Sequence, residues 1–554
     1  MSFFVACRLG CLVILLALSG CAFHRADVSR VGSCNIEADG VLQKKAPKLI
    51  AQASAQPDLC HAISALSREE IAQDDTTSAL NTAGIIADQR FMYVQSLVSD
   101  RHRQDVVSFS SLLMAYLTQA DFECRHPIYA SYFRKRFDGQ LNYDHCLQSV
   151  PFFLFDTHVG GQLVTVDPRA VREIHLVFAS EGKGVASSFG HVSVRFLVCP
   201  DVSSSLLDCR KNLLNHIFLG YVARIDGMEM DLLKGLVGGY DAHLFGSTFR
   251  EVFRSNTVLA DRDVYSLPLN LSENEIIQIV RDLSEIHWAY RGNYRFITAN
   301  CATLLQDLLN QALGLEEEEE TELDFLRPDS LFSALRDSKL ARGDVFASLA
   351  LAEQQGYFFP RNRIYYQQAL DYLQSNIADY PFYSLDEYGQ TRASARLIAL
   401  LSDDAIYKAF QRNERLVEAQ RLLEERWLML LWFESFQQVV SIIVELNLIQ
   451  LLEVKIAQMS DGEDKQLLLQ CYMQPLRQIS REVERFNGIP SVSQLPEYIF
   501  DKRRSCHSQE AQQRVFDVIN SALVSDNSLI KKLKGLEHEL AQALDNIETL
   551  ERFF

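Results

Sequence analysis

The chain has 554 residues, of which 48% are hydrophobic and 23% are charged, and its formal net charge is −18. This length exceeds what one compact core accommodates, so we expect several domains. The acidic balance and the lack of clustered Lys and Arg argue against a nucleic-acid partner, because phosphate binding requires a basic surface.

The first residues are typical of a cleaved export signal. Arg8 precedes an apolar run over residues 11–18, which is too short to span a bilayer. The ending Leu-Ser-Gly-Cys resembles the bacterial lipoprotein signal, in which the cysteine is lipidated and becomes the first mature residue. This resemblance implies removal of residues 1–20, acylation of Cys21 (with palmitate, for example) and, because Ala22 follows, anchoring to the periplasmic side of the outer membrane. An ordinary secretory signal or a membrane anchor is the alternative.

The number of cysteines fits an oxidising compartment. Of twelve, Cys7 and Cys11 leave with the signal and Cys21 carries lipid, so nine remain. One free thiol and four disulfides account for an odd number, and we take Cys301 as the free thiol. Sequence leaves the pairing open, although we expect sequential pairs, with buried thiols as the alternative, among Cys34, Cys60, Cys124, Cys146, Cys199, Cys209, Cys471 and Cys506.

Composition and periodicity divide the rest of the chain into five segments. We expect a polar, irregular tether over 21–57, a helical region over 58–160, a mixed α+β domain over 161–315, an acidic linker over 316–325 and a helical domain over 326–554.

The mixed domain contains β-rich runs such as "REIHLVFAS", "HVSVRFLVCP" and "HIFLGYVARID", then a glycine-rich loop "GLVGGYDAHLFG" and a strand "DVYSLPLNL". Ser272 and Glu275 form a capping-box pattern at the start of a helix. In the last domain, the apolar stretch after Arg426 contains Glu and Gln, which predicts a core helix and not a membrane span. Leucines at three- and four-residue spacing near the C-terminus predict a helical hairpin or a short coiled coil.

Two short stretches place a histidine and a cysteine at the ends of predicted elements. In "ASSFGHVSVRF", His191 begins a strand, and in "YRFITANCATLLQDLL", Cys301 lies at the start of a helix capped by Thr298 or Asn300. The helix dipole and unpaired amides would lower the pKa of this thiol, and a nearby imidazole would complete an activated nucleophile. The helix amides would then serve as an oxyanion hole. A structural histidine and a buried thiol are the alternative.

Together these stretches resemble a known family. The pattern "SxFGHxxxRF", a "GGY" loop and "YRFxxxNC" is similar to the Lnb N-terminal periplasmic domain family over roughly residues 165–315, with weaker similarity in "CRHPIYASYF" and "LRPDSLFSALRDSKL". The family is related to permuted papain-like enzymes of the NlpC and lecithin retinol acyltransferase kind, in which the histidine strand precedes the cysteine helix. The resemblance implies a permuted papain-like α+β fold, with Cys301 as nucleophile and His191 as base.

The resemblance also implies a reaction class, namely thiol chemistry on an acyl or amide bond in the envelope. The family name refers to lipoprotein N-acyl transfer, in which a thioester passes its acyl group to an amine. Acyltransferase members carry a membrane-spanning portion that we do not find here, which leaves the acyl donor, and transfer or hydrolysis, open. Candidates to orient the histidine are His216, Tyr221 and Arg224, and candidates to line the site are Asn300, Ser188 and Tyr240.

Two other functions stay open, a peptidoglycan amidase or endopeptidase of the NlpC type and a non-catalytic envelope scaffold. The chain contains no HExxH, no paired CxxC and no GxSxG, so we expect no metal, no cofactor and no serine nucleophile. An apolar groove at Cys301 would favour acyl chains as substrate, and a polar open cleft would favour peptidoglycan. A thiol buried away from His191 would favour the scaffold.

Overall fold

The computed structural model describes most of residues 44–445, with longer gaps at 64–84, 99–107, 183–189, 225–238 and 316–322, a few residues between 457 and 491, and residues 528–552. The described chain divides into two compact units, Met1–Ile86 with Arg134–Gln140 and Ala87–Phe133 with Leu141–Phe554. Several predictions concern residues outside the described ranges, namely those on the signal segment, Cys21, Cys34, Ser188, Cys471 and Cys506.

Helices precede the sheet, as expected from the sequence. They are α3 (Pro47–Ala55), α6 (Gln89–Val98), α7 (Phe109–Thr118), α8 (Phe122–Arg125) and α9 (Pro127–Phe137). Helix α3 lies in the segment that we expected to be an irregular tether. Its first residue is a proline, which suits a helix start, and its buried face is formed by Leu49, Ile50 and Ala53 at helical spacing.

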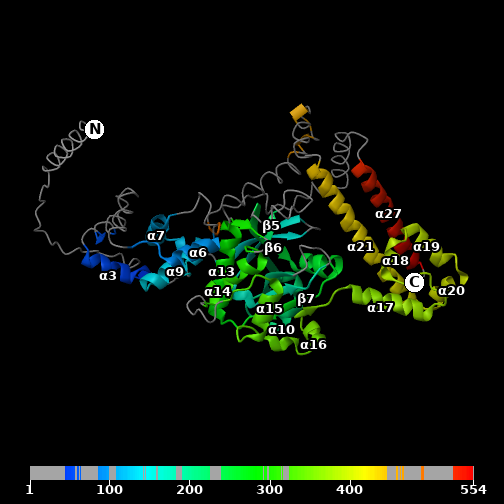
Figure 1. Cartoon of the computed structure of the whole chain (residues 1–554), viewed down its shortest axis with the longest axis horizontal. Helices are drawn as coiled ribbons and strands as arrows, with labels where there is room; N and C mark the ends of the chain where they lie inside the picture. The colour runs from blue at the N-terminus through cyan, green and yellow to red at the C-terminus, as the bar shows by residue number, and fades with distance from the viewer. Residues whose placement is uncertain are drawn as a thin grey trace, which may run out of the picture. The chain divides into compact units, whose positions relative to one another are not determined.

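A nine-stranded sheet forms the core of the second unit (Figure 1). The order is β2-β1-β6-β5-β4-β3-β7-β9, with β8 paired to β6, and all pairs are antiparallel except β1 with β6. The bounds are β1 (Val150–Asp156), β2 (Gly160–Val166), β3 (Val171–Ala179), β4 (His191–Val198), β5 (Ile217–Arg224), β6 (Tyr240–Thr248), β7 (Val264–Pro268), β8 (Gly292–Tyr294) and β9 (Phe358–Phe359). The prediction of a mixed α+β region is confirmed.

The sheet extends beyond the predicted 161–315 at both ends. Strand β1 lies in the segment predicted to be helical, and β9 follows the predicted acidic linker. The run "VPFFLFD" of β1 is short and almost wholly apolar, and such a run carries no periodicity that separates strand from helix. Pairing with β2 and β6, which lie elsewhere in the sequence, decides its conformation.

Strand β6 corrects the prediction of a glycine-rich loop, because "YDAHLFGST" is extended and buries alternate residues from Tyr240 onward. Gly246 lies opposite Leu154 of the parallel neighbour β1. A Cβ at Gly246 would approach the carbonyl oxygen of Phe153 to 2.5 Å. This glycine therefore permits the close pairing of β1 and β6 and does not mark a turn.

The two faces of the sheet carry different helices. On one face, α13 (Glu273–Ala289) contacts β1, β3 and β6, α14 (Cys301–Leu313) contacts β4 and β5, and α15 (Pro328–Asp337) contacts β3 and β4. On that face Phe196 of β4 packs against Phe152, which contacts His287 of α13. The other face is covered by α12 (Phe249–Phe253) and the π-helical turn Arg254–Leu259. The predicted capping box of α13, between Ser272 and Glu275, is confirmed.

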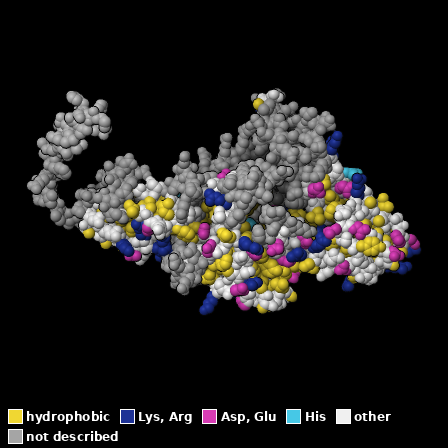
Figure 2. Space-filling model, viewed as in Figure 1, with side chains coloured by type: hydrophobic (Ala, Val, Ile, Leu, Met, Phe, Trp, Pro, Cys, Tyr) yellow, Lys and Arg dark blue, Asp and Glu magenta, His cyan; other side chains and the backbone are white. Residues whose placement is uncertain are grey.

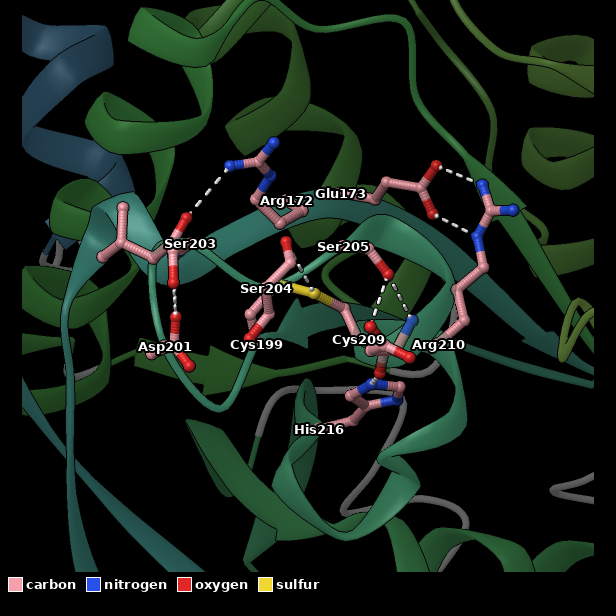
Figure 3. Close-up of a disulfide and its surroundings, with 12 residues drawn as sticks. Arg172, Glu173, Cys199, Asp201, Ser203, Ser204, Ser205, Cys209, Arg210 and His216 are labelled. Atoms are coloured by element: carbon pink, nitrogen blue, oxygen red, sulfur yellow. Dashed lines mark hydrogen bonds and ion pairs between the residues drawn. A yellow bond between two sulfur atoms is a disulfide. The ribbon is translucent and has the colours of Figure 1, made fainter.

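Two disulfides confirm two of the four expected sequential pairs. Cys199 bonds Cys209, with 4.5 Å between the Cα atoms, and Cys124 bonds Cys146, with 5.3 Å between them. Figure 3 shows the first of these, which joins the end of β4 to α10 (Leu206–Lys211). Cys60 is also disulfide-bonded. Among the described cysteines Cys301 is free, as expected.

Helices make up the described C-terminal region. They are α17 (Arg363–Asn376), α18 (Leu385–Gln390), α19 (Ala393–Leu401), α20 (Asp404–Arg412), α21 (Glu414–Glu445) and α27 (Ser528–Glu551). The last two pack side by side (Figure 1). Within the described residues, no helix has both the length and the hydropathy that a membrane span requires.

Charged side chains of both signs are mixed on the described surface. On the face shown in Figure 2, Lys and Arg side chains are interspersed with Asp and Glu side chains. The described residues on that face therefore form no large basic patch of the kind that binds a phosphate backbone.

The core of the C-terminal helices contains a buried ion pair. Arg396 donates to both carboxylate oxygens of Glu424 at 3.0 and 2.7 Å, and the side chains are 0% and 1% exposed. Tyr388 donates to the same carboxylate at 2.6 Å. A buried carboxylate that loses its cation keeps its desolvation cost without compensation.

We expect Arg396→Met to lower the free energy of unfolding by about 3–5 kcal/mol, because Glu424 would stay buried without its cation. Urea unfolding followed by tryptophan fluorescence measures this loss. The matched control is Arg421→Met, which breaks a half-exposed pair with Glu425 and should cost about 0.5 kcal/mol or less. Equal losses in the two variants would contradict the argument.

Candidate functional site

Asn300 fixes the start of α14 and thus the position of Cys301. Its Oδ1 accepts the amides of Ala302 and Thr303 at 2.8 and 3.2 Å, and its Nδ2 donates to the carbonyl of Leu326 at 2.9 Å. The Cys301 amide donates to the Tyr294 hydroxyl at 3.2 Å. The first three amides of the helix are therefore already paired, which does not support the expectation that they form an oxyanion hole.

A gap in the sheet lets His191 reach Cys301. Strand β4 pairs with β3 along its whole length, from His191 onward, but pairs with β5 only at residues 194–196. The Val192 amide donates to the sulfur of Cys301 at this gap. His191 and Cys301 are hydrogen-bonded through their side chains, although β4 directs His191 toward the α12 face and α14 lies on the other.

Burial and mutual attraction oppose each other at this pair. The thiol is only 4% exposed, and burial disfavours the thiolate. The charge and hydrogen bond of His191, the Val192 amide and the Tyr294 hydroxyl outweigh burial and lower the pKa of Cys301. Burial likewise disfavours the imidazolium, but Cys301 raises the pKa of His191 overall. Each group of the pair therefore shifts the pKa of the other toward its charged form.

Tyr294 is a site residue that we did not predict. It ends β8, and its hydroxyl both accepts the Cys301 amide and donates to the sulfur. Burial, followed by the charge of the thiolate, raises the pKa of Tyr294, so the phenol stays protonated. The motif "YRFxxxNC" begins with this residue, which was the available signal. The predicted site-lining Tyr240 lies opposite Tyr294 in the β6–β8 register.

Gly220 of β5 leaves room for the His191 ring. A Cβ at Gly220 would lie 3.3 Å from Nε2 of His191 and 3.2 Å from Cβ of Ser193. These approaches are tighter than ordinary van der Waals contact. The absence of a side chain at position 220 therefore helps to fix the position of the ring.

A cavity of about 240 Å³ opens beside His191 on the α12 face of the sheet. Eight of its fourteen lining residues are apolar or glycine and come from β3, β5, β6, β7 and α12, six are polar, and Cys301 is not among them. The lining residues are Val177, Ala179, His191, Ser193, Phe218, Gly220, Val222, Phe245, Ser247, Val252, Ser255, Asn256, Arg262 and Val264. This volume is below the range of about 300–1,000 Å³ for whole drug-sized ligands, so the cavity suits one part of a substrate.

His216, a candidate to orient His191, contacts other groups instead. Its Nδ1 accepts from the buried Arg195 at 2.7 Å, and its Nε2 donates to the Cys209 carbonyl at 3.0 Å (Figure 3). Burial, aided by the charge of Arg195, lowers the pKa of His216 to about 3, so the ring is neutral. Arg195 also donates to Ser266 and to the carbonyl of Gly356 at 3.0 and 2.8 Å, which ties β4 to its surroundings.

The other two orienting candidates are placed as follows. Tyr221 is buried and meets the ring of Tyr290 edge-on at 5.2 Å. Arg224 is the last residue of β5, opposite Asp241 of β6. Among the described side chains, Cys301 is the one hydrogen-bonded to the His191 ring, and an orienting partner of His191 is not found within these residues.

One cluster among the described residues has the geometry of metal ligands, formed by Cys124, His145 and Cys146. The two cysteines are joined in a disulfide and cannot act as thiolate ligands. This cluster is therefore no metal centre while the disulfide is formed.

Comparison with known proteins confirms the resemblance over part of the chain. Residues 163–329 match the family model of the Lnb N-terminal periplasmic domain. The matched segment includes both His191 and Cys301, and it continues past the predicted boundary at 315 into the start of α15. No curated protein and no solved structure matched the chain.

We expect the thiolate of Cys301 to form below the ordinary cysteine pKa of about 8.5, because the imidazolium of His191 stabilises it. Iodoacetamide labelling of Cys301 across pH, normalised to the plateau at high pH, reports its midpoint independently of restricted access. His191→Ala should raise the midpoint, and Tyr294→Phe should raise it less.

Cys301→Ser serves as the control for labelling at other positions. A wild-type midpoint at or above that of His191→Ala would contradict the assigned ion pair.

Proposed function

We propose that this protein is a cysteine-dependent acyltransferase or hydrolase that acts on lipid or lipoprotein acyl groups at the periplasmic face of the outer membrane. The observation that carries the proposal is the contact between Cys301 and His191, in which the thiolate is favoured, beside a cavity with apolar walls. The match to the Lnb N-terminal periplasmic domain supports it. The order of histidine strand before cysteine helix supports a permuted papain-like fold.

The proposed reaction has two steps. The Cys301 thiolate attacks the carbonyl carbon of an acyl ester, a C–S bond forms, and the C–O bond to the leaving alcohol breaks. The imidazolium of His191 gives its proton to the departing alkoxide. An amine or water then attacks the thioester while neutral His191 takes its proton, the C–S bond breaks, and the thiolate returns.

Negative charge on the carbonyl oxygen requires hydrogen-bond donors close to the sulfur. The first-turn amides of α14 are occupied by Asn300 and Tyr294. The donors at the sulfur itself are the Tyr294 hydroxyl and the Val192 amide. Once the sulfur is acylated it no longer carries the charge that these groups stabilise, so we assign them to the oxyanion.

The apolar walls of the cavity favour an acyl chain over the second candidate, a peptidoglycan peptide. Strands β3, β5 and β7 contribute Val177, Val222 and Val264 to the walls. Such walls gain free energy by removing methylene groups from water, about 0.8 kcal/mol for each buried group. A polar sugar or peptide would gain no comparable stabilisation from these three valines.

We expect incubation with short-chain phospholipids to add one acyl group to Cys301, detected by intact mass and removed by neutral hydroxylamine, as a thioester is. Cys301→Ala should stay unmodified, and His191→Ala should slow acylation by a factor of about 10² or more, because it lacks its general acid. Purified peptidoglycan is the matched competing substrate. Cleavage of peptidoglycan without acylation by lipid would transfer the assignment to the NlpC-type reaction.

We also propose a lipid anchor at Cys21, which lies outside the described residues. The mature wild-type chain should fractionate with the outer membrane and carry the mass of a diacylglyceryl group and any N-acyl chain at its N-terminus. Cys21→Ser should release it, because one polar residue replaces the anchor. A Cys21→Ser protein that stays membrane-bound would argue against this anchor.

A further inference from the structure

Arg262 is the cation of the cavity beside His191. It follows the π-helical turn after α12, and its backbone amide donates to the carbonyl of Asn256 at 2.9 Å. Both residues line the cavity together with His191 and Ser193. The turn therefore brings a guanidinium and a side-chain amide to the same wall.

The guanidinium of Arg262 has no partner among the residues that the structure describes. Its Nε is buried without a hydrogen bond, and none of its side-chain nitrogens forms an ion pair with a described group. The acidic neighbours do not neutralise it. Asp263 is bound to Arg361, with a shortest contact of 2.7 Å. Asp261 precedes it without pairing to it.

The backbone before Arg262 is in an uncommon conformation. Asp261 has a φ of 54°, in the left-handed region, which aspartate adopts more readily than most residues with a Cβ. Such conformations persist where the surrounding structure holds them, and they are frequent at ligand sites. Here the reversal directs the chain from the helical turn into β7 and sets the position of Arg262.

Arg262 is only partly buried, but its Nε lies out of water without a hydrogen bond. Burial lowers the pKa of Arg262, and its charge also opposes protonation of His191. An anion between Arg262 and His191 would favour the charged form of each side chain. Arginine suits this task because its planar donors bind phosphate and carboxylate oxygens in pairs.

We propose that Arg262 binds the phosphate group of a phospholipid acyl donor and thereby places the ester carbonyl of that lipid at Cys301. This assignment rests on the proposed acyl chemistry and names the chemical class of its donor. Apolar walls beside an unpaired cation match a molecule that joins an acyl chain to a phosphate within a few bonds. Ser255 and Asn256 lie at the same wall, but their donors already bind the carbonyl of Val252 and, from Asn256, the Ser255 hydroxyl, so the assignment rests on Arg262.

The test compares two alkylating reagents of nearly equal size, iodoacetate and iodoacetamide, at Cys301. The ratio of their rates cancels any change in the thiolate fraction. Arg262→Gln should lower the ratio of iodoacetate to iodoacetamide about tenfold, because a charge-assisted hydrogen bond is lost. Arg262→Lys should retain most of the ratio. Arg169→Gln, which removes an exposed charge outside the cavity, should leave it unchanged.

A second arm identifies the source of the anion. Dihexanoyl phosphatidylglycerol should protect wild-type Cys301 from iodoacetamide at concentrations where neutral dihexanoylglycerol does not, and Arg262→Gln should lose this difference. Stronger protection by a peptide that ends in two alanine residues would overturn the lipid assignment in favour of a peptide carboxylate.

These outcomes are separable from the proposed function, since alkylation requires no acyl transfer. An unchanged reagent ratio in Arg262→Gln would overturn the role of Arg262 even if lipids acylate Cys301. Absence of acylation by every donor would overturn the acyl chemistry even if the ratio falls.

Discussion

The site depends on one contact, between the thiol of Cys301 and the imidazole of His191. Cys301 begins helix α14 on one face of the sheet. His191 begins strand β4, and its side chain is directed toward the opposite face. They meet because β4 leaves β5 at residue 194 while it stays paired with β3. Continued pairing with β5 would occupy the Val192 amide and close the gap. Register is therefore the constraint on which the chemistry rests.

The surroundings hold this gap in place from several directions. Arg195 ties β4 to His216 and Ser266 four residues beyond His191. Gly220 gives the imidazole its space, and Asn300 fixes the helix that carries the thiol. Each of these residues acts on the position of a neighbour, so we expect a substitution at any one of them to change the geometry of the site.

The sequence predicted the local elements well and the long-range pairing poorly. Strand β4, the capped helix at Cys301 and the Cys199–Cys209 bond follow from patterns within about fifteen residues. Strand β1 and strand β6 were missed, because an apolar run and a glycine-rich run become strands only through partners far along the chain. The contact of His191 with Cys301 was expected from a family motif, since no spacing within one element predicts it.

The roles of the other site residues also depend on long-range pairing that the sequence does not predict. Tyr294 was part of a quoted motif, but its hydroxyl contacts Cys301 only because β8 pairs with β6 beside the start of α14. His216 was a reasonable orienting candidate by residue type, yet it lies just before β5 and its ring accepts a hydrogen bond from Arg195. Arg262 lies in no motif that we singled out. Its proposed role depends on the three-dimensional structure, because the neighbouring carboxylate of Asp263 binds Arg361 instead.

The order of the described cysteines has a consequence for biogenesis. The two described bonds close loops of 22 and 10 residues, and both lie before Cys301 in the chain. A chain that enters an oxidising compartment N-terminus first would complete these pairs from thiols that arrive together. When Cys301 emerges, those partners are already consumed. Pairing in this order would remove Cys124, Cys146, Cys199 and Cys209 as partners of Cys301, and Cys471 and Cys506, which follow Cys301 in the sequence, would arrive later.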